Sequence, residues 1–104
     1  KVHEYPYIER TSKLCSATPD HPKAIQTLDA DTTVSHWSFE AALRAAGSVC
    51  EAVDKVMAGD FRNAFCAIRP PGHHAGPRGI VTCPNDPDGS HGFCLLNNVA
   101  IGAA

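Results

Sequence analysis

Hydrophobic residues recur with helical spacing over one long segment, residues 37–59. Apolar side chains occupy positions 39, 42, 43, 46, 49, 50, 53, 56 and 57, which is the i, i+3, i+4, i+7 pattern of an amphipathic helix. Ser35 or Ser38 can cap the start of this helix, and Gly59 can end it in a left-handed conformation. Because many residues of the apolar face are alanines, we predict that the helix packs closely against a sheet.

The pattern of apolar residues changes on both sides of this helix. Residues 4–15 fit a short helix with a proline in its first turn, and turn residues make 16–36 a connector. Residues 63–69, NAFCAIR, form a short apolar run that predicts a strand buried on both faces, as in parallel sheets. Residues 69–92 hold five of the eight prolines and five of the eight glycines, which predicts a long functional loop. Residues 92–104 return to an apolar pattern and predict a helix entering the core.

A helix followed by a turn and a buried strand is typical of an α/β sandwich. The length of 104 residues allows one domain at most. The net charge of -2 argues against direct nucleic-acid binding, and no apolar run approaches membrane-spanning length. The five cysteines are scattered and odd in number, which indicates reduced thiols in an intracellular protein. Since the chain lacks an initial methionine and stops within the last predicted helix, we expect it to be part of a larger domain, truncated at both ends.

Two adjacent histidines follow the predicted strand, in the stretch AIRPPGHHAG. Pro70 and Pro71 end the strand because they lack backbone donors and fix φ, and Gly72 lets the chain turn sharply. His73 and His74 then lie at the carboxyl end of a strand, where open α/β sheets bind ligands. With different partners, one imidazole can act as a general base while the other carries charge. The alternative is a pair of histidines in an ordinary surface turn.

Two motifs together resemble a known family. RPPGHHA at 69–75 followed by GFCLLNNVAIGAA at 92–104 is similar to the zinc-dependent histone deacetylase and acetylpolyamine amidohydrolase superfamily, and most similar to its class II type. The resemblance extends to VHEYPYIE near the start and to residues 29–75. It covers most of the chain but only an N-terminal to central part of the family's domain. It implies an arginase-like three-layer α/β sandwich with a mainly parallel sheet, and hydrolysis of the acetamide of acetyl-lysine.

The resemblance also implies roles for single residues. His74 matches the general base that then protonates the leaving amine, and His73 matches its electrostatic helper, both near a zinc-bound water. Gly92 and Phe93 match the wall of the substrate channel. Cys94 matches a cysteine close to the metal.

The rim of the channel is less sharply matched. Asp31 falls where the family has an aspartate that holds the substrate backbone, but Asp29 stands two residues away. The segment 75–91 is longer than the family's usual link, and we expect it to reshape the rim.

The family's zinc ligands lie beyond the point where this chain ends. We therefore expect a zinc cofactor held by residues outside residues 1–104, no metal ligand within it, and no activity of this chain alone. The implied partners are acetyl-lysine proteins, histone tails among them, and a corepressor-type complex in the nucleus or cytoplasm, with no nucleic acid or membrane. One alternative is a non-catalytic scaffold or binding protein that retains the fold. Another is a small zinc site made by Cys83, His91, Cys94 and one of the paired histidines, although the spacing lacks a CxxC.

Overall fold

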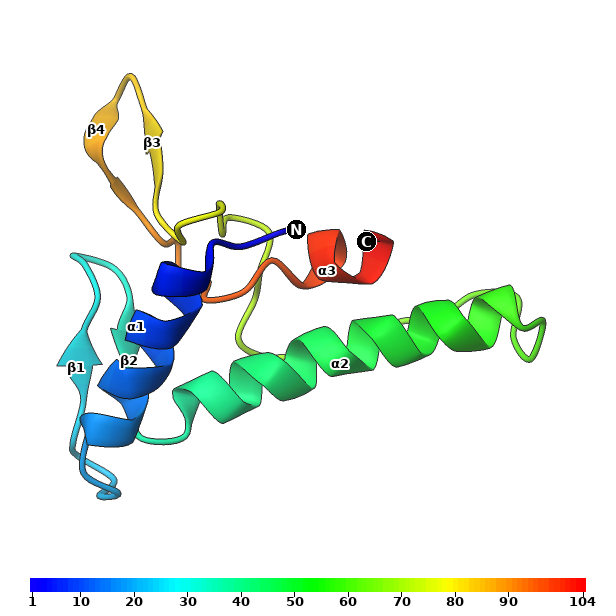
Figure 1. Ribbon diagram of the computed structural model, residues 1–104, viewed down its shortest axis with the longest axis horizontal. Helices are drawn as coiled ribbons and strands as arrows, with labels where there is room; N and C mark the ends of the chain where they lie inside the picture. Colours follow the sequence, from blue (N-terminus) through cyan, green and yellow to red (C-terminus); the bar gives the residue numbers. More distant parts are fainter.

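A computed structural model describes residues 1–104, the whole chain. The elements in chain order are α1 (Tyr5–Ala17), β1 (Gln26–Thr27), β2 (Thr33–Val34), α2 (Ser38–Met57), β3 (Val81–Cys83), β4 (Asp86–Ser90) and α3 (Asn98–Ala103). The long helix α2 crosses the molecule, with α1 and the β1–β2 pair at its N-terminal end and α3 alongside it (Figure 1). The β3–β4 hairpin projects from the side that also carries α3. None of the helices is long and apolar enough to cross a membrane.

Both helices predicted before residue 60 are confirmed. In α1 the buried residues Tyr7, Thr11 and Cys15 recur every four positions, as expected for one face of a helix. In α2 the buried residues are alanines at 42, 45 and 46. The expected serine cap is wrong, because Trp37 occupies the cap position without a side-chain hydrogen bond. Gly59 follows the last turn with φ +82°, in the predicted left-handed conformation.

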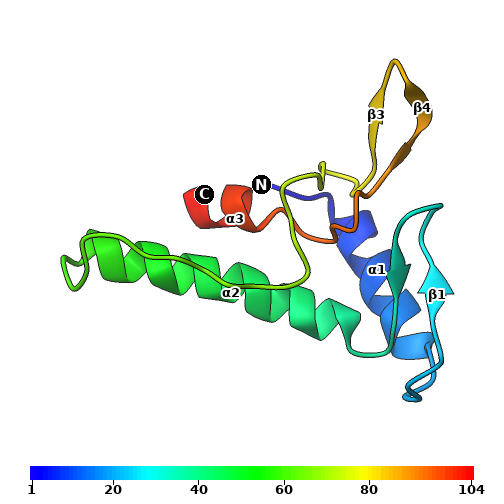
Figure 2. The same ribbon diagram turned by 180° about the vertical axis from the view of Figure 1, so that it is seen from behind.

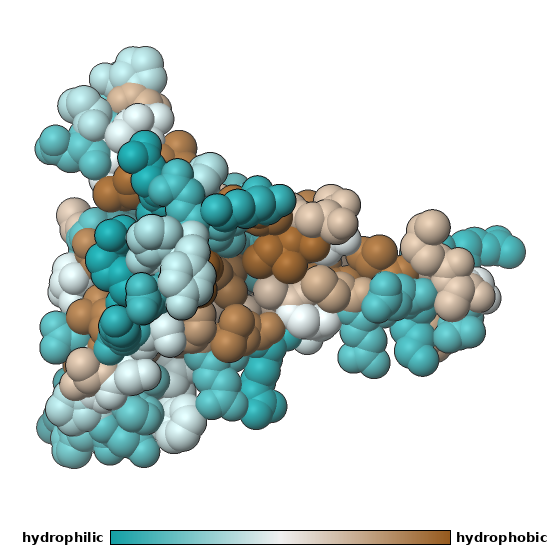
Figure 3. Space-filling view, viewed as in Figure 1, coloured by the Kyte–Doolittle hydropathy of each residue, from teal (hydrophilic) through white to brown (hydrophobic).

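The core lies where α1, β2, α2 and the segment before α3 meet. Its buried members are Cys15, Val34, Ala42, Ala46, Leu95 and Leu96. The alanine face of α2 therefore packs on α1, on Val34 of the short strand β2 and on the segment at 95–96, and not on the extended parallel sheet that was predicted. Figure 3 shows further apolar side chains gathered where α3 lies over the middle of α2. There α3 approaches closely, since a Cβ at Gly102 would stand 2.5 Å from the Val49 side chain.

The strand predicted for residues 63–69 does not form within this chain. The segment is extended and runs back along α2 (Figure 2), but the only sheets are the antiparallel pairs β1–β2 and β3–β4. The Phe65 side chain is 93% exposed. An apolar run specifies burial, whereas a strand also needs neighbours for its ladder of hydrogen bonds. No other segment of residues 1–104 supplies that neighbour, so the predicted parallel sheet is not formed here.

The predicted loop and last helix are each partly right. The loop at 69–92 contains the β3–β4 hairpin, in which Val81 pairs with Ser90 and Cys83 with Asp86. The final helix begins at Asn98 rather than near residue 92. Positive φ angles at Gly92 and Phe93 exclude a start at those two residues, and the Asn97 side chain caps the helix where it does begin. Leu95 and Leu96 nevertheless enter the core as predicted.

Candidate active site

Five of the six residues predicted for the site line one groove of about 690 Å³. The β3–β4 hairpin supplies its other side, so the long segment 75–91 does form part of the rim. The lining residues are Asp31, Pro71, His73, His74, Val81, Cys83, Asp86, Ser90, Gly92 and Phe93. Cys94 lies directly behind this surface and is fully buried.

The histidine loop is anchored to the beginning of α3. Gly72 packs so closely that a Cβ would stand 2.2 Å from the Leu96 carbonyl oxygen and 2.6 Å from the Asn98 backbone nitrogen. The Asn98 side-chain amide donates a hydrogen bond of 3.2 Å to the Pro70 carbonyl. Only a glycine fits at this point, which explains why the turn before the histidines requires one.

A second asparagine holds the other end of the histidine loop. The side-chain amide of Asn97 donates to the Ala75 carbonyl at 3.0 Å, while its oxygen caps α3 by accepting from the Ala100 amide. The rings of His73 and His74 are exposed, with centroids 4.3 Å apart and planes tilted by 50°. Neither asparagine was predicted for the site, because both lie inside the helix predicted at 92–104, although an asparagine is a common helix cap.

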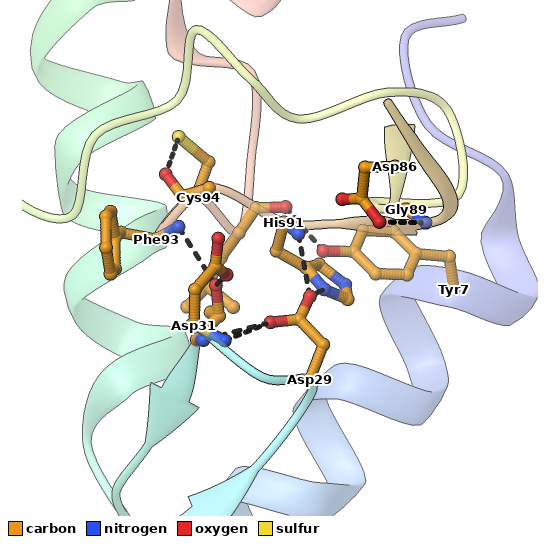
Figure 4. Close-up of polar contacts among 11 residues, drawn as sticks. Tyr7, Asp29, Asp31, Asp86, Gly89, His91, Phe93 and Cys94 are labelled. Atoms are coloured by element: carbon orange, nitrogen blue, oxygen red, sulfur yellow. Dashed lines mark hydrogen bonds and ion pairs between the residues drawn. The ribbon is translucent and has the colours of Figure 1, made fainter. Parts of the chain in front are cut away.

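A left-handed turn adjoins His74 and forms another part of the groove. Gly92 and Phe93 have φ angles of +56° and +63°, a region that residues with a Cβ seldom occupy. A Cβ at Gly92 would stand 2.9 Å from three atoms of the His74 side chain. The Phe93 side chain is 62% exposed and lines the groove. The Cys94 thiol donates a hydrogen bond of 3.3 Å to the Gly92 carbonyl (Figure 4).

The two aspartates near the rim have different surroundings. Asp31 lines the groove, whereas the Asp29 side chain is only 11% exposed and is hydrogen-bonded to the ring and the backbone amide of His91. Burial opposes ionisation of Asp29, but hydrogen bonds from His91 and Asp31 outweigh it and hold the pKa of Asp29 well below its usual range. The structure thus places Asp31 at the groove and Asp29 behind it, a distinction that the sequence left open.

Tyr7 of α1 contacts two residues close to the left-handed turn, Leu95 and His91. Its hydroxyl donates a hydrogen bond of 2.6 Å to the Leu95 carbonyl, and its ring stacks on His91 at 6.2 Å between centroids. Burial raises the pKa of the Tyr7 hydroxyl. The neutral phenol donates to the segment that follows Gly92 and Phe93.

No three His, Cys, Asp or Glu side chains of this chain lie where they could hold a metal ion. The alternative zinc site is contradicted, because the His91 ring is engaged with Asp29, Cys94 is buried against Gly92 and Cys83 is exposed on the hairpin. All five cysteines are free thiols. A zinc ion at this groove would need ligands from outside residues 1–104.

Known proteins resemble this chain over its full length. The family model described as histone deacetylase domain matches residues 1–104. A type-2 histone deacetylase 2 of Dictyostelium discoideum is 62% identical over 73 residues, which are 70% of this chain and 4% of that protein. A histone deacetylase-like amidohydrolase of Pseudomonas aeruginosa is 34% identical over 101 residues, covering 97% of this chain and 22% of that protein.

A solved structure gives the same result for the fold. The crystal structure of the HDA15 HD domain superimposes with a TM-score of 0.78 and 29% identity, over 98% of this chain and 25% of that one. This likeness confirms the predicted arginase-like α/β fold class. The chain spans a quarter or less of each of these relatives. With the match to the family model over all of its residues, the chain belongs to the histone deacetylase domain family.

Proposed function

We propose that the whole protein carrying this chain hydrolyses the acetamide of acetyl-lysine side chains, and that this chain supplies the histidine pair and one wall of the substrate channel. The observation that carries the proposal is the convergence of Asp31, His73, His74, Gly92 and Phe93 on one groove from three separate segments. The proposed substrates are acetylated intracellular proteins, histone tails among them, met in the nucleus or cytoplasm within a corepressor-type complex. Support for this substrate class comes from the relatives named as histone deacetylases.

One imidazole transfers the proton, and the other stabilises the charge that develops. His74 accepts a proton from the water that attacks the acetyl carbonyl, and returns it to the lysine amine as the C–N bond breaks. His73, whose ring centroid lies 4.3 Å away, stabilises the charge that develops beside it. A histidine suits this work because its pKa lies close to neutral pH, where the side chain both accepts and donates protons.

The channel wall orients the acetyl-lysine. The exposed phenyl ring of Phe93 packs along the methylene groups of the lysine. The Gly92 carbonyl accepts the N–H of the acetamide. A carbonyl oxygen has two lone pairs, so it can accept this hydrogen bond and the one from the Cys94 thiol together. Asp31 accepts a backbone N–H of the substrate at the rim.

Histone deacetylases are generally zinc-dependent, and a bound zinc ion would polarise the acetyl carbonyl and acidify the attacking water. The side chains of this chain do not form a zinc site by themselves. The roles proposed above involve only side chains and backbone groups of residues 1–104. Zinc ligands are predicted to lie outside this chain, and Cys94 is predicted to lie near the metal.

The test is acetate release from acetyl-lysine peptides by the whole protein. We expect His74→Ala to lower kcat by about a hundredfold or more, since general acid–base catalysis contributes about 10²–10⁴-fold. His21→Ala is the matched control, because His21 is exposed and its side chain bonds only to the nearby Lys23 amide. Wild-type turnover in His74→Ala would overturn the role of His74. Binding of the peptide without turnover by the unmodified protein would favour the non-catalytic scaffold.

A further inference from the structure

We propose that Asp29, acting with His91 and Thr32, is a positioning group that holds the channel wall against His74. The proposal rests on the proposed function and adds residues that touch neither substrate nor the reacting atoms. Asp29 joins two loops that are 62 residues apart in the sequence. One loop carries Asp31 at the rim, and the other carries the left-handed turn of Gly92 and Phe93.

Both oxygens of the Asp29 carboxylate are fully used. Oδ1 accepts from the backbone amides of Asp31 at 3.0 Å and Thr32 at 2.9 Å. Oδ2 accepts from the backbone amide of His91 at 2.7 Å and from the His91 ring Nδ1. Four N–H donors therefore converge on one largely buried carboxylate, and Figure 4 shows it lying between the two loops. Charge-assisted bonds of this kind are the strongest hydrogen bonds in proteins.

Thr32 makes a second tie between the same two loops. Its hydroxyl accepts from the Phe93 backbone amide at 2.9 Å and donates to the Asp31 carboxylate at 2.6 Å. Residues on both sides of Gly92 are thus bonded to the loop at 29–32. A phenylalanine with positive φ persists only where its surroundings hold it, and these bonds supply that restraint.

The restrained turn at Gly92 and Phe93 also restricts the position of His74. Gly92 lies so close to the His74 side chain that no Cβ would fit between them. A displacement of the turn would therefore reach the imidazole directly. Tyr7 packs on the ring of His91, so the ring keeps its orientation toward Asp29. Asp29, Thr32 and His91 thus fix the positions of the groove residues from the buried side. The groove residues themselves stay exposed to substrate.

Asp29→Asn is the informative change. An asparagine keeps the shape but offers one oxygen and one NH₂ group, and the NH₂ group cannot accept a hydrogen bond. Whichever way the amide is turned, its NH₂ group faces at least one backbone N–H that then has no acceptor. We expect kcat of the whole protein on acetyl-lysine peptides to fall about tenfold or more, because small misplacements in an active site carry costs of this size. The control is Asp54→Asn on the exposed side of α2, with expected turnover within twofold of wild type.

A pair of changes at His91 separates positioning from simple loss of folding. His91→Asn retains an N–H donor near the position of Nδ1, whereas His91→Leu keeps volume without a donor. We expect the asparagine variant to retain several-fold more activity than the leucine variant. Equal activities in the two would overturn the proposal, as would wild-type kinetics in Asp29→Asn.

Crystal structures of the whole protein and its Asp29→Asn variant give a readout that needs no turnover. We expect the turn at Gly92 and Phe93 to move relative to His74 in the variant. An unmoved turn overturns the positioning role. If the unmodified protein releases no acetate, the proposed function fails, while the position of the turn still decides the role of Asp29.

Discussion

A methyl group added at Gly92 should damage the groove, whereas the same change at Gly47 of α2 should not. The backbone there has φ +56°, and an L-residue in the left-handed region costs about 1–2 kcal/mol. The new Cβ would stand 2.9 Å from the Cβ, Cγ and Cδ2 atoms of His74. Carbon atoms at optimal contact are about 3.5–4.0 Å apart. One partner must therefore shift by roughly 0.6 Å or more.

Both ways of relieving this contact lower activity. If the imidazole swings aside, the proposed base leaves its place in the groove. If the turn moves instead, the channel wall at Phe93 moves with it. A displacement near 1 Å can cost about a hundredfold in rate, so we expect Gly92→Ala to reduce kcat/KM by about tenfold to a hundredfold. We also expect its free energy of unfolding to fall by about 1–2 kcal/mol.

Gly47→Ala is the matched control, and we expect it to raise the free energy of unfolding rather than lower it. Gly47 lies within α2, and a Cβ built there meets nothing within 4 Å. Alanine in a helix interior is more stable than glycine by about 0.5–1 kcal/mol. Steady-state kinetics and urea unfolding of the whole protein compare the two variants. Wild-type activity and stability in Gly92→Ala, or equal losses in both variants, would refute the reasoning.

Three further changes test the supports of the groove. Tyr7→Phe removes the donor to the Leu95 carbonyl and should cost about 1–3 kcal/mol in urea unfolding, because it leaves a buried acceptor unpaired. Gly72→Ala places a Cβ 2.2 Å from the Leu96 carbonyl and should abolish acetate release, whereas wild-type kinetics would contradict the anchoring of the histidine loop. The lowered pKa of Asp29 means that its stabilising contribution is present above about pH 4, the usual value for an aspartate, and is lost as the pH falls below it. Asp29→Asn should therefore show a shallower loss of unfolding free energy than wild type between pH 5 and pH 3, measured by urea titration at each pH.

The sequence predicted the helices well because their signal is local. The proline in the first turn of α1 and the spacing of apolar residues in α2 involve only neighbouring positions, and a glycine at 59 marks an end whatever surrounds it. The run at 63–69 shows the limit of this reasoning. Its composition indicates burial, but the ladder partner of a strand comes from another segment, and none of residues 1–104 takes that place. Periodicity carries no information about which distant segment will pair.

The groove residues were predicted from motif and resemblance, whereas their supports were not. Asp29 and Asp31 are both aspartates, two positions apart, so the sequence alone does not distinguish them. Their surroundings differ because His91 lies beside Asp29. Asn97 and Asn98 likewise gain their importance from the carbonyls of Ala75 and Pro70. These partners are 22 to 62 residues apart, so no pattern in a short window contains them.

This separation explains how two exposed imidazoles can be placed accurately. Residues that touch a substrate must remain open to solvent, so they cannot be fixed by being buried themselves. In this chain the fixing is done by buried polar contacts one layer behind, where a carboxylate and a threonine hydroxyl hold the turn that abuts His74. A histidine pair in an ordinary surface turn would have no reason for such anchors. The polar layer behind the groove is therefore the physical feature that favours a working site over two histidines on a loop.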